Sequence, residues 1–288
     1  MDLDGVGIWS LQLRFGDPGA AAEAAAELDE LGYRALWVPD SGGPVFEALA
    51  NLLGATRRTV IATGILNLWM HEPAFVASSR AALAEKFGER LLLGIGVSHA
   101  RLVDRKEQGR YRQPVRAMTA FLDEIDVAVP PVPVADRVLA ALGPKMLELA
   151  RTRARGAHPY LVTPEHTAIA RTTLGVGPLL APEQAVVLTD DRAAGLLVAR
   201  KFLAGYLELP NYANSLRRLG FTEDDITGVS DRLVDATIAI GDEAAIAKRV
   251  GEHRAAGADH VCVQVINADN SFSLPTEEWR RLAPALLD

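Results

Sequence analysis

The sequence predicts an α/β fold, a (β/α)8 TIM barrel with an insertion before its last helix. Three observations lead to this expectation. Short apolar runs alternate along the whole chain with stretches of helical periodicity, which is the pattern of a parallel sheet covered by helices. Polar residues follow several of these runs at the point where a strand would end. The length of 288 residues is normal for one barrel domain. A doubly wound open sheet is the alternative.

Eight apolar runs account for the expected strands, each followed by a helical stretch. We expect the strands at 6–10, 35–38, 59–66, 91–97, 137–142, 157–162, within 179–188, and at 260–266.

The helical stretches carry recognisable ends. Pro18 stands in the first turn of the first one, where proline is favoured, and Gly32 follows it as a stop signal. Thr163 precedes Pro164 and is expected to cap the helix after the sixth strand. We expect helices at 17–31, 45–54, 75–87, 114–126, 145–150, from 164, at 191–207, from 243, and after Pro275.

Residues 1–288 are expected to form a single domain in which 206–235 is an insertion. This segment does not fit the alternation of strands and helices, and it contains Tyr206, Asn211, Tyr212 and Asn214. Long additional segments of compact domains are often active-site lids. We therefore interpret it as a lid.

The composition argues against several classes of partner. The formal net charge is -7, from 30 basic and 37 acidic residues, so nucleic acid is not expected as a partner. The sequence has neither a signal peptide nor an apolar run of about 20 residues, which predicts a cytoplasmic protein without a membrane partner. The single cysteine, Cys262, is interpreted as a buried strand residue. The six histidines are scattered, so no metal site is predicted.

Polar and aromatic side chains at the expected strand ends form the candidate site, because the carboxyl ends of parallel strands meet at one face. His99 is the candidate acid–base group, since imidazole titrates near neutral pH. Asp40 is expected to hold a catalytic group or a polar edge of a cofactor. The alternatives are a solvated histidine and a turn aspartate, because Ser41-Gly42-Gly43 follows Asp40.

Six short segments can be compared with known families: 35–40, 63–65, 71–74, 90–97, 141–145 and 257–261. Together, and in this order along the chain, they resemble the luciferase-like oxidoreductases, and in particular the branch that uses the deazaflavin coenzyme F420. The resemblance implies a (β/α)8 barrel, commonly a homodimer, with a flavin or deazaflavin at the carboxyl-terminal mouth. It also implies a bulge with a cis peptide, here Gly64–Ile65, which would cost about 2.5–4 kcal/mol. A plain glycine bulge is the alternative.

Placement at strand ends, at helix starts and in the insertion, together with the resemblance, suggests roles for individual residues. The residues expected to bind the cofactor are Asp40, Ser41, Gly64, Ile65, Asn67, Ser98, Gly143, Lys145 and Thr163. The residues expected to contact the substrate are Trp9, Trp69, His71, Tyr206 and Tyr212.

Some of these residues also have purely structural interpretations. Gly143 and Lys145 open a helix whose N-terminus suits a phosphate, although an ordinary turn explains them equally well. Thr163 is interpreted as a helix N-cap or as a phosphate ligand, and the cap is favoured for its hydroxyl. A related branch carries histidine after the aspartate, where this chain has Ser41.

Three functions follow from these observations. The first is an F420-dependent oxidoreductase that exchanges hydride with a small organic substrate. The second is an FMN-dependent monooxygenase on the same fold. The third is a barrel that binds a cofactor or ligand without turnover, which Ser41 favours.

Overall fold

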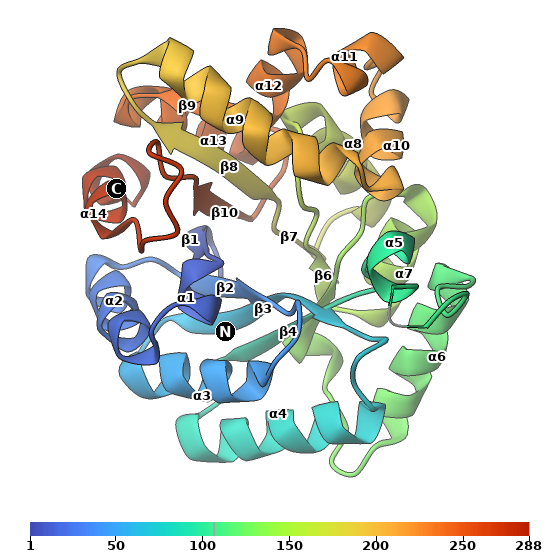
Figure 1. Ribbon diagram of the computed structural model, residues 1–288. Coiled ribbons are helices and arrows are strands. Elements are labelled where there is room, and N and C mark those ends of the chain that lie inside the picture. The colour runs from blue at the N-terminus through green and yellow to red at the C-terminus, as the bar shows by residue number, and fades with distance from the viewer. Residues whose placement is uncertain (106, 288) are drawn as a thin grey trace.

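The computed structural model describes residues 1–105 and 107–287, whose strands form one parallel sheet (Figure 1). The strands occur in the order β7-β6-β5-β4-β3-β2-β1-β10-β8-β9. Their bounds are β1 Gly5–Trp9, β2 Ala35–Pro39, β3 Val60–Asn67, β4 Leu91–Gly96, β5 Arg137–Leu139, β6 Gly156–Ala157, β7 Leu179–Leu180, β8 Glu183–Leu188, β9 Ile238–Gly241 and β10 His260–Val265.

The sheet curls back on itself between β7 and β8. These strands stand at and near opposite ends of the strand order, yet only Ala181 and Pro182 separate them in the chain. The Ala181 N–H donates to the Ala157 carbonyl at 2.9 Å, and the Pro182 carbonyl accepts from the Cys262 N–H at 2.9 Å. One segment therefore joins β6 on one side to β10 on the other. The predicted α/β fold with a parallel sheet is confirmed.

Several strand predictions differ from the structure. The range 179–188, expected to hold one strand, holds both β7 and β8. The fifth and sixth strands end at Leu139 and Ala157, earlier than expected, and the chain beyond β6 bends, with Leu161 at a φ of 55°. The strand Ile238–Gly241 was not predicted at all, and it pairs with β8 at the edge of the sheet. Its sequence, Ile-Ala-Ile-Gly, shows no alternation of apolar and polar residues, which is the pattern that identifies a half-buried strand.

The helices largely follow the sequence signals. The Asp17 side chain caps α2 by accepting from the Ala20 N–H at 2.8 Å, and Gly32 ends this helix at a φ of 101°. The predicted cap at Thr163 is confirmed, because its hydroxyl accepts from the His166 N–H at 3.3 Å.

The helix bounds are α1 Gln12–Phe15, α2 Pro18–Leu31, α3 Val45–Ala55, α4 Pro73–Phe87, α5 Ala100–Val103, α6 Pro114–Val127, α7 Pro144–Arg153, α8 Pro164–Leu174, α9 Arg192–Leu207, α10 Pro210–Arg218, α11 Glu223–Thr227, α12 Asp231–Thr237, α13 Glu243–Ala255 and α14 Thr276–Leu286, with a short 3₁₀ helix at Val134–Asp136.

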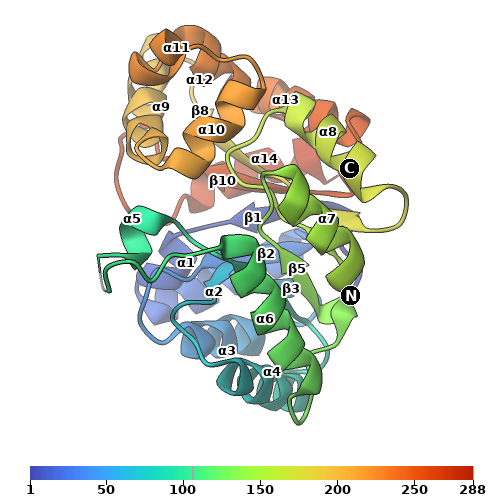
Figure 2. The same cartoon turned by 90° about the vertical axis from the view of Figure 1, so that its right-hand side faces the viewer.

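The segment 206–235 contains α10, α11 and most of α12. These helices lie with α9 at one side of the sheet, and the short helix α5 lies on the same side (Figure 2). The N-terminus lies on the opposite side in that view. The segment therefore lies at the carboxyl ends of the strands, where β4 leads into α5.

Alternating strand residues divide the core into two layers. Leu36 and Val38 of β2 pack among the side chains beneath the outer helices, whereas Ala35 and Trp37 face the interior of the curled sheet. The interior layer continues into the side chains of α9 to α12. Cys262 on β10 is fully buried in this layer, as predicted.

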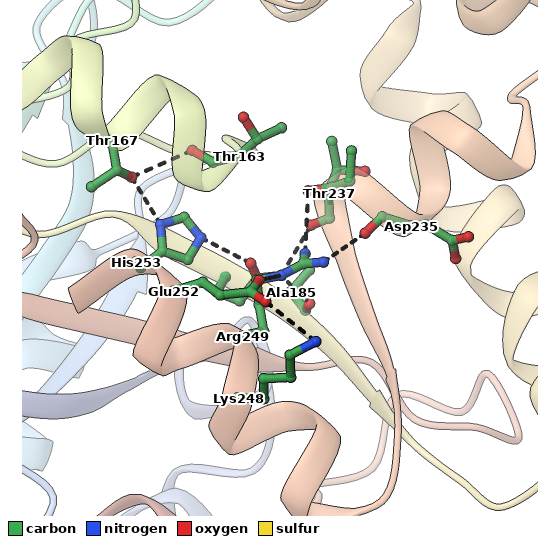
Figure 3. Close-up of polar contacts among 11 residues, drawn as sticks. Thr163, Thr167, Ala185, Asp235, Thr237, Lys248, Arg249, Glu252 and His253 are labelled. Carbon is green, nitrogen blue, oxygen red and sulfur yellow. Dashed lines mark hydrogen bonds and ion pairs between the residues drawn. The ribbon is translucent and has the colours of Figure 1, made fainter. Parts of the chain in front are cut away.

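A buried polar network joins α8, α13 and β8 (Figure 3). His253 Nδ1 lies 2.8 Å from the Thr167 hydroxyl, and His253 Nε2 lies 3.0 Å from Gln184 Oε1. The Gln184 amide group donates to the Ala185 carbonyl at 2.7 Å and to the Thr237 carbonyl at 3.0 Å. This carboxamide therefore has a partner for each of its hydrogen-bonding groups.

We expect Gln184→Leu to destabilise the protein by about 3 kcal/mol, because it leaves several buried groups without partners at about 1–3 kcal/mol each. Urea unfolding measures the change. Lys248→Ala is the control, because its ion pair with Glu252 spans 3.6 Å and the lysine side chain is 80% exposed. The control should change stability by less than about 1 kcal/mol. Equal stability of Gln184→Leu and the wild type would contradict the role of this network.

Candidate active site

A cavity of about 690 Å³ opens at the carboxyl ends of the strands. The strand ends supply one part of its wall, the chain between β4 and α6 a second part, and α9 with α10 a third. It is lined by most of the predicted residues: Trp9, Asp40, Ser41, Gly64, Ile65, Asn67, Trp69, Ser98, His99, Gly143, Tyr206 and Tyr212. Residues far apart in sequence thus meet at one site, as expected for strand ends of a parallel sheet.

Three predicted residues do not line this cavity. Lys145 is exposed on α7, because this helix packs by the opposite face, which carries Met146 and Leu147. Thr163 is buried and its hydroxyl is used as the helix cap. His71 lies beside Asp40, with its Nε2 at 2.7 Å from Asp40 Oδ2.

Strand β3 contains a bulge at Gly64. Val38 pairs with Thr63 and Pro39 pairs with Ile65, which leaves Gly64 as the additional residue. The Gly64–Ile65 peptide is trans, so the expected cis bond is wrong. The additional residue by itself redirects the strand, and the plain glycine bulge is therefore the correct alternative.

Close packing of glycines fixes the position of this bulge. A Cβ on Gly94 would lie 2.1 Å from the Thr63 carbonyl oxygen, and a Cβ on Gly64 would lie 2.3 Å from Trp9 Nε1. The Thr63 hydroxyl also donates to the Gly94 carbonyl at 2.8 Å. The indole of Trp9 thus packs directly on Gly64, and β4 holds the bulge from the other side.

Asp40 joins the bulge to the end of β3. Its N–H donates to the Ile65 carbonyl at 3.0 Å, and its Oδ2 accepts from the Asn67 N–H at 3.0 Å. The Asp40 side chain is fully buried and also contacts His71. Because protein groups occupy this carboxylate, its geometry is that of a positioning group. The pairing of Asp40 with His71 was not predicted from the sequence, although both residues follow neighbouring strands.

His99 lies at the cavity in an apolar and aromatic environment. Its ring centroid is 4.9 Å from that of Tyr212. Burial lowers the pKa of His99 to about 4, so the imidazole is neutral at pH 7. Its buried Nδ1 has no hydrogen-bond partner within 1–105 and 107–287.

Two tyrosines line the cavity, and a buried glutamine outside its lining bonds to one of them. The Tyr160 hydroxyl lies 2.7 Å from Gln264 Oε1 and 2.8 Å from the Tyr206 hydroxyl. Since Gln264 Oε1 can only accept, Tyr160 donates to it and accepts from Tyr206. Burial raises the pKa of Tyr206 to about 12, so these hydroxyls stay protonated. Tyr160 was missed, although it lies within the expected sixth strand.

Polar contacts also connect the chain after β4 to the segment 206–235. The Asn211 amide donates to the Ser98 carbonyl at 3.3 Å, and Arg101 forms an ion pair with Glu208. Ser98 adopts a φ of 54°, which is uncommon for a residue other than glycine. The two sides of the cavity mouth are therefore in direct contact.

Glu183 is a fully buried carboxyl group in the interior, at the start of β8. Its Oε2 accepts from the Leu161 N–H at 3.0 Å. Burial raises the pKa of Glu183 to about 8, so the folded protein holds its proton at neutral pH. Between its unfolded pKa, near 4.5, and about 8, only the unfolded state has released this proton, so stability falls as pH rises through this window.

We expect Glu183→Gln to remove this loss, because glutamine keeps the acceptor for Leu161 and cannot ionise. Relative to the wild type, the variant should gain on the order of 3 kcal/mol between pH 5 and pH 8. Urea unfolding of both proteins at the two pH values measures the difference, and the buried histidines contribute equally to both. If the free energy of unfolding changes with pH in the same way in both proteins, Glu183 ionises in the folded state with little loss of stability.

Within the described residues, no three His, Cys, Asp or Glu side chains are grouped so that they could hold a metal ion. Over the same residues, no helix has the length and apolar character needed to span a membrane.

Comparison with known proteins gives a consistent result. A model of the luciferase-like monooxygenase family matches residues 6–260. A Mycobacterium tuberculosis protein, whose name assigns it provisionally to the coenzyme F420-dependent oxidoreductases, is 24% identical, and the match covers 92% of this chain and 94% of the relative.

Solved structures share the fold at low identity. An F420-dependent secondary alcohol dehydrogenase in complex with an F420–acetone adduct superposes with a TM-score of 0.77 and 14% identity over 100% of both chains. The FMN-bound oxygenating constituent of the Pseudomonas putida 3,6-diketocamphane monooxygenase superposes with a TM-score of 0.68 and 14% identity over 99% of both chains.

Proposed function

Because the chain belongs to the luciferase-like monooxygenase family, we propose that it is an oxidoreductase that uses the deazaflavin coenzyme F420 to exchange hydride with a small organic substrate. The observation that carries this proposal is the cavity at the strand ends, which brings His99 and the Gly64 bulge together. The names of the M. tuberculosis relative and of the secondary alcohol dehydrogenase support F420 as the cofactor.

We also propose that the curled sheet is a (β/α)8 barrel. In this assignment β7 and β8 together form one strand of the ring, and β9 lies outside it. The pairing of Ala181 with β6 and of Pro182 with β10 supports this arrangement. The segment 206–235 is then the insertion, and its contacts to Ser98 and Arg101 support a lid.

The cavity residues fit a flat, partly anionic cofactor. The volume of about 690 Å³ lies in the range of small-molecule sites, about 300–1,000 Å³. Aromatic side chains supply flat walls, and buried ring nitrogens of Trp9 and His99 lack partners among the residues that the structure describes. Three arginines also line the cavity, and they suit an anionic group: Arg105, Arg110 and Arg218.

In this proposal the chain positions the reactants and moves a proton. Coenzyme F420 supplies the hydride donor or acceptor. The ring system would be held at the bulge by Gly64, Ile65, Asn67 and Ser41, with Asp40 fixing the bulge from behind. When an alcohol is oxidised, the neutral His99 ring accepts the hydroxyl proton. In the reverse direction the protonated ring returns it to the oxygen.

The second candidate is an FMN-dependent monooxygenase, which the FMN-bound structural neighbour favours. The third, a barrel that binds a ligand without turnover, rests on Ser41 at the position where a related branch has histidine. The predicted homodimer and cytoplasmic location stay predictions.

Cofactor titration distinguishes these functions. We expect the purified protein to bind F420 in the micromolar range or tighter, and FMN more weakly, when each is titrated in turn and followed by fluorescence. The absorption spectrum of protein purified from a host that makes both cofactors provides the second readout. Tight FMN binding without F420 binding would replace the first proposal by the second. Binding without reduction or oxidation by any substrate would favour the third.

A further inference from the structure

The cavity is lined by a second histidine that the proposed proton transfer does not use. His158 follows β6 and is fully buried, yet it belongs to the cavity wall. Its ring stacks on the indole of Trp37, with 4.4 Å between centroids and 18° between planes. Trp37 is itself fully buried and donates to His260 Nε2 at 3.1 Å. The orientation of the His158 ring is therefore fixed by packing.

Hydrogen bonding fixes the tautomer of this ring. His158 Nδ1 lies 2.7 Å from the Ala181 carbonyl oxygen, which can only accept, so Nδ1 carries the hydrogen. Burial lowers the pKa of His158 to about 4, and the ring is neutral at pH 7. In a neutral ring with hydrogen on Nδ1, the other nitrogen carries a lone pair and is an acceptor only.

The acceptor nitrogen is the unusual feature. His158 Nε2 is buried and lies on the side of the ring away from Ala181, and within the described parts of the chain it has no hydrogen-bond partner. Buried polar atoms in native proteins nearly always have a partner, so each exception requires an explanation. Here the atom belongs to a residue that lines a ligand-sized cavity, and the missing partner must be a hydrogen-bond donor.

We propose that His158 Nε2 accepts a hydrogen bond from an O–H or N–H group of the ligand bound in this cavity, and that it thereby determines specificity for ligands that carry such a donor. This inference rests on the proposed function for the identity of the ligand. Two sources supply the donor: a ring N–H of the cofactor, or the hydroxyl of an alcohol substrate. A ketone lacks such a donor.

Two substitutions separate this role from a structural one. In His158→Asn, the side-chain amide can still donate to the Ala181 carbonyl, but nothing replaces Nε2. In His158→Gln, the longer amide reaches the position of Nε2 and can accept there, but the bond to Ala181 is lost. If His158 is only structural, ligand binding should be weakened in His158→Gln and retained in His158→Asn. If Nε2 is an acceptor for the ligand, binding should be weakened in His158→Asn and retained in His158→Gln.

His166→Gln is the matched control. His166 is also buried, its Nε2 lies 3.0 Å from the Leu142 carbonyl, and its unpartnered Nδ1 does not belong to the cavity wall. This substitution therefore removes an unpartnered ring nitrogen of a buried histidine outside the cavity. We expect it to leave ligand affinity unchanged.

The experiment measures dissociation constants of F420, FMN, cyclohexanol and cyclohexanone for the wild type and the three variants. We expect His158→Asn to weaken binding of a donor-bearing ligand by roughly threefold to tenfold, and His158→Gln to restore much of it. Loss confined to F420 or FMN assigns the donor to the cofactor. Loss of the preference for cyclohexanol over cyclohexanone assigns it to the substrate. Unchanged binding in His158→Asn, with all four probes, overturns the proposal.

The ¹⁵N spectrum of histidine-labelled protein provides a readout independent of activity. The acceptor-type resonance of Nε2, identified by its loss in His158→Asn, should shift when the donor-bearing probe is added. If none of the probes shifts this resonance, the partner of Nε2 is a bound water and the proposal is overturned. If neither cofactor binds, the proposed function fails, but the alcohol and ketone arm still decides the role of His158.

Discussion

His99→Ala should lower the rate of substrate turnover by about 10²- to 10⁴-fold, the range usual for loss of a general acid–base group. The reason is that hydride exchange at a carbon bearing oxygen requires a proton transfer at that oxygen, and His99 lines the cavity with an Nδ1 that has no hydrogen-bond partner in the described residues. Cofactor affinity should change little, because the ring system would be held by the bulge. Steady-state kinetics and cofactor titration of the same variant measure the two effects.

Two further measurements distinguish a chemical role of His99 from a packing role. Added imidazole should restore part of the turnover in His99→Ala, because it supplies the missing group in the space that the substitution leaves. The acidic limb of the kcat/KM profile should lie near pH 4, since burial lowers the pKa of His99 to about that value. Turnover that equals the wild type would remove His99 from the mechanism.

Gly94→Ala is expected to destabilise the protein by about 3 kcal/mol or more, with loss of cofactor binding. A Cβ at this position would lie 2.1 Å from the Thr63 carbonyl oxygen, which is backbone and cannot rotate away. The bulge at Gly64 would have to move. The bond from the Asp40 N–H to the Ile65 carbonyl and the bond from the Asn67 N–H to the Asp40 carboxylate would be disturbed with it. Urea unfolding measures the stability, and fluorescence titration measures the binding.

The control for this prediction is Gly251→Ala. Gly251 lies within α13 and has no atom within 4 Å of its would-be Cβ. Alanine in a helix interior is favoured over glycine by about 0.5–1 kcal/mol, so this variant should be more stable than the wild type. If Gly94→Ala and Gly251→Ala have the same stability and the same cofactor affinity, the contact between β4 and the bulge does not determine the geometry of the site.

The sequence predicted the fold well because the signals for it are local. Pro18, Gly32 and Thr163 mark helix ends through capping rules that depend on a few neighbouring residues. The short strands were predicted less well. The strand β9 and the early end of β6 depend on pairing with distant segments, which no local pattern encodes.

In the candidate site too, features that follow from local rules were predicted, and features that depend on distant contacts were not. Most of the predicted residues line the cavity because strand ends of a parallel sheet converge, a rule that needs only the order of strands. Lys145 was placed by analogy with phosphate-binding helix ends, and the structure turns it outward. Thr163 was given both a cap role and a phosphate role, and its hydroxyl is the helix cap. The cis peptide at Gly64–Ile65 was wrong, since the bulge alone accommodates the additional residue.

The sequence by itself determined the alternation of strands and helices, and thereby the face on which Asp40, Asn67 and His99 gather, because hydrophobic periodicity and capping act over a few residues. Only the tertiary structure decided which polar atoms at that face have a hydrogen-bond partner. It pairs Asp40 with His71 and leaves ring nitrogens of His99 and His158 without partners in the described residues. Hydrogen bonding and burial depend on neighbours that lie far away in the chain, and these neighbours meet only when the sheet curls.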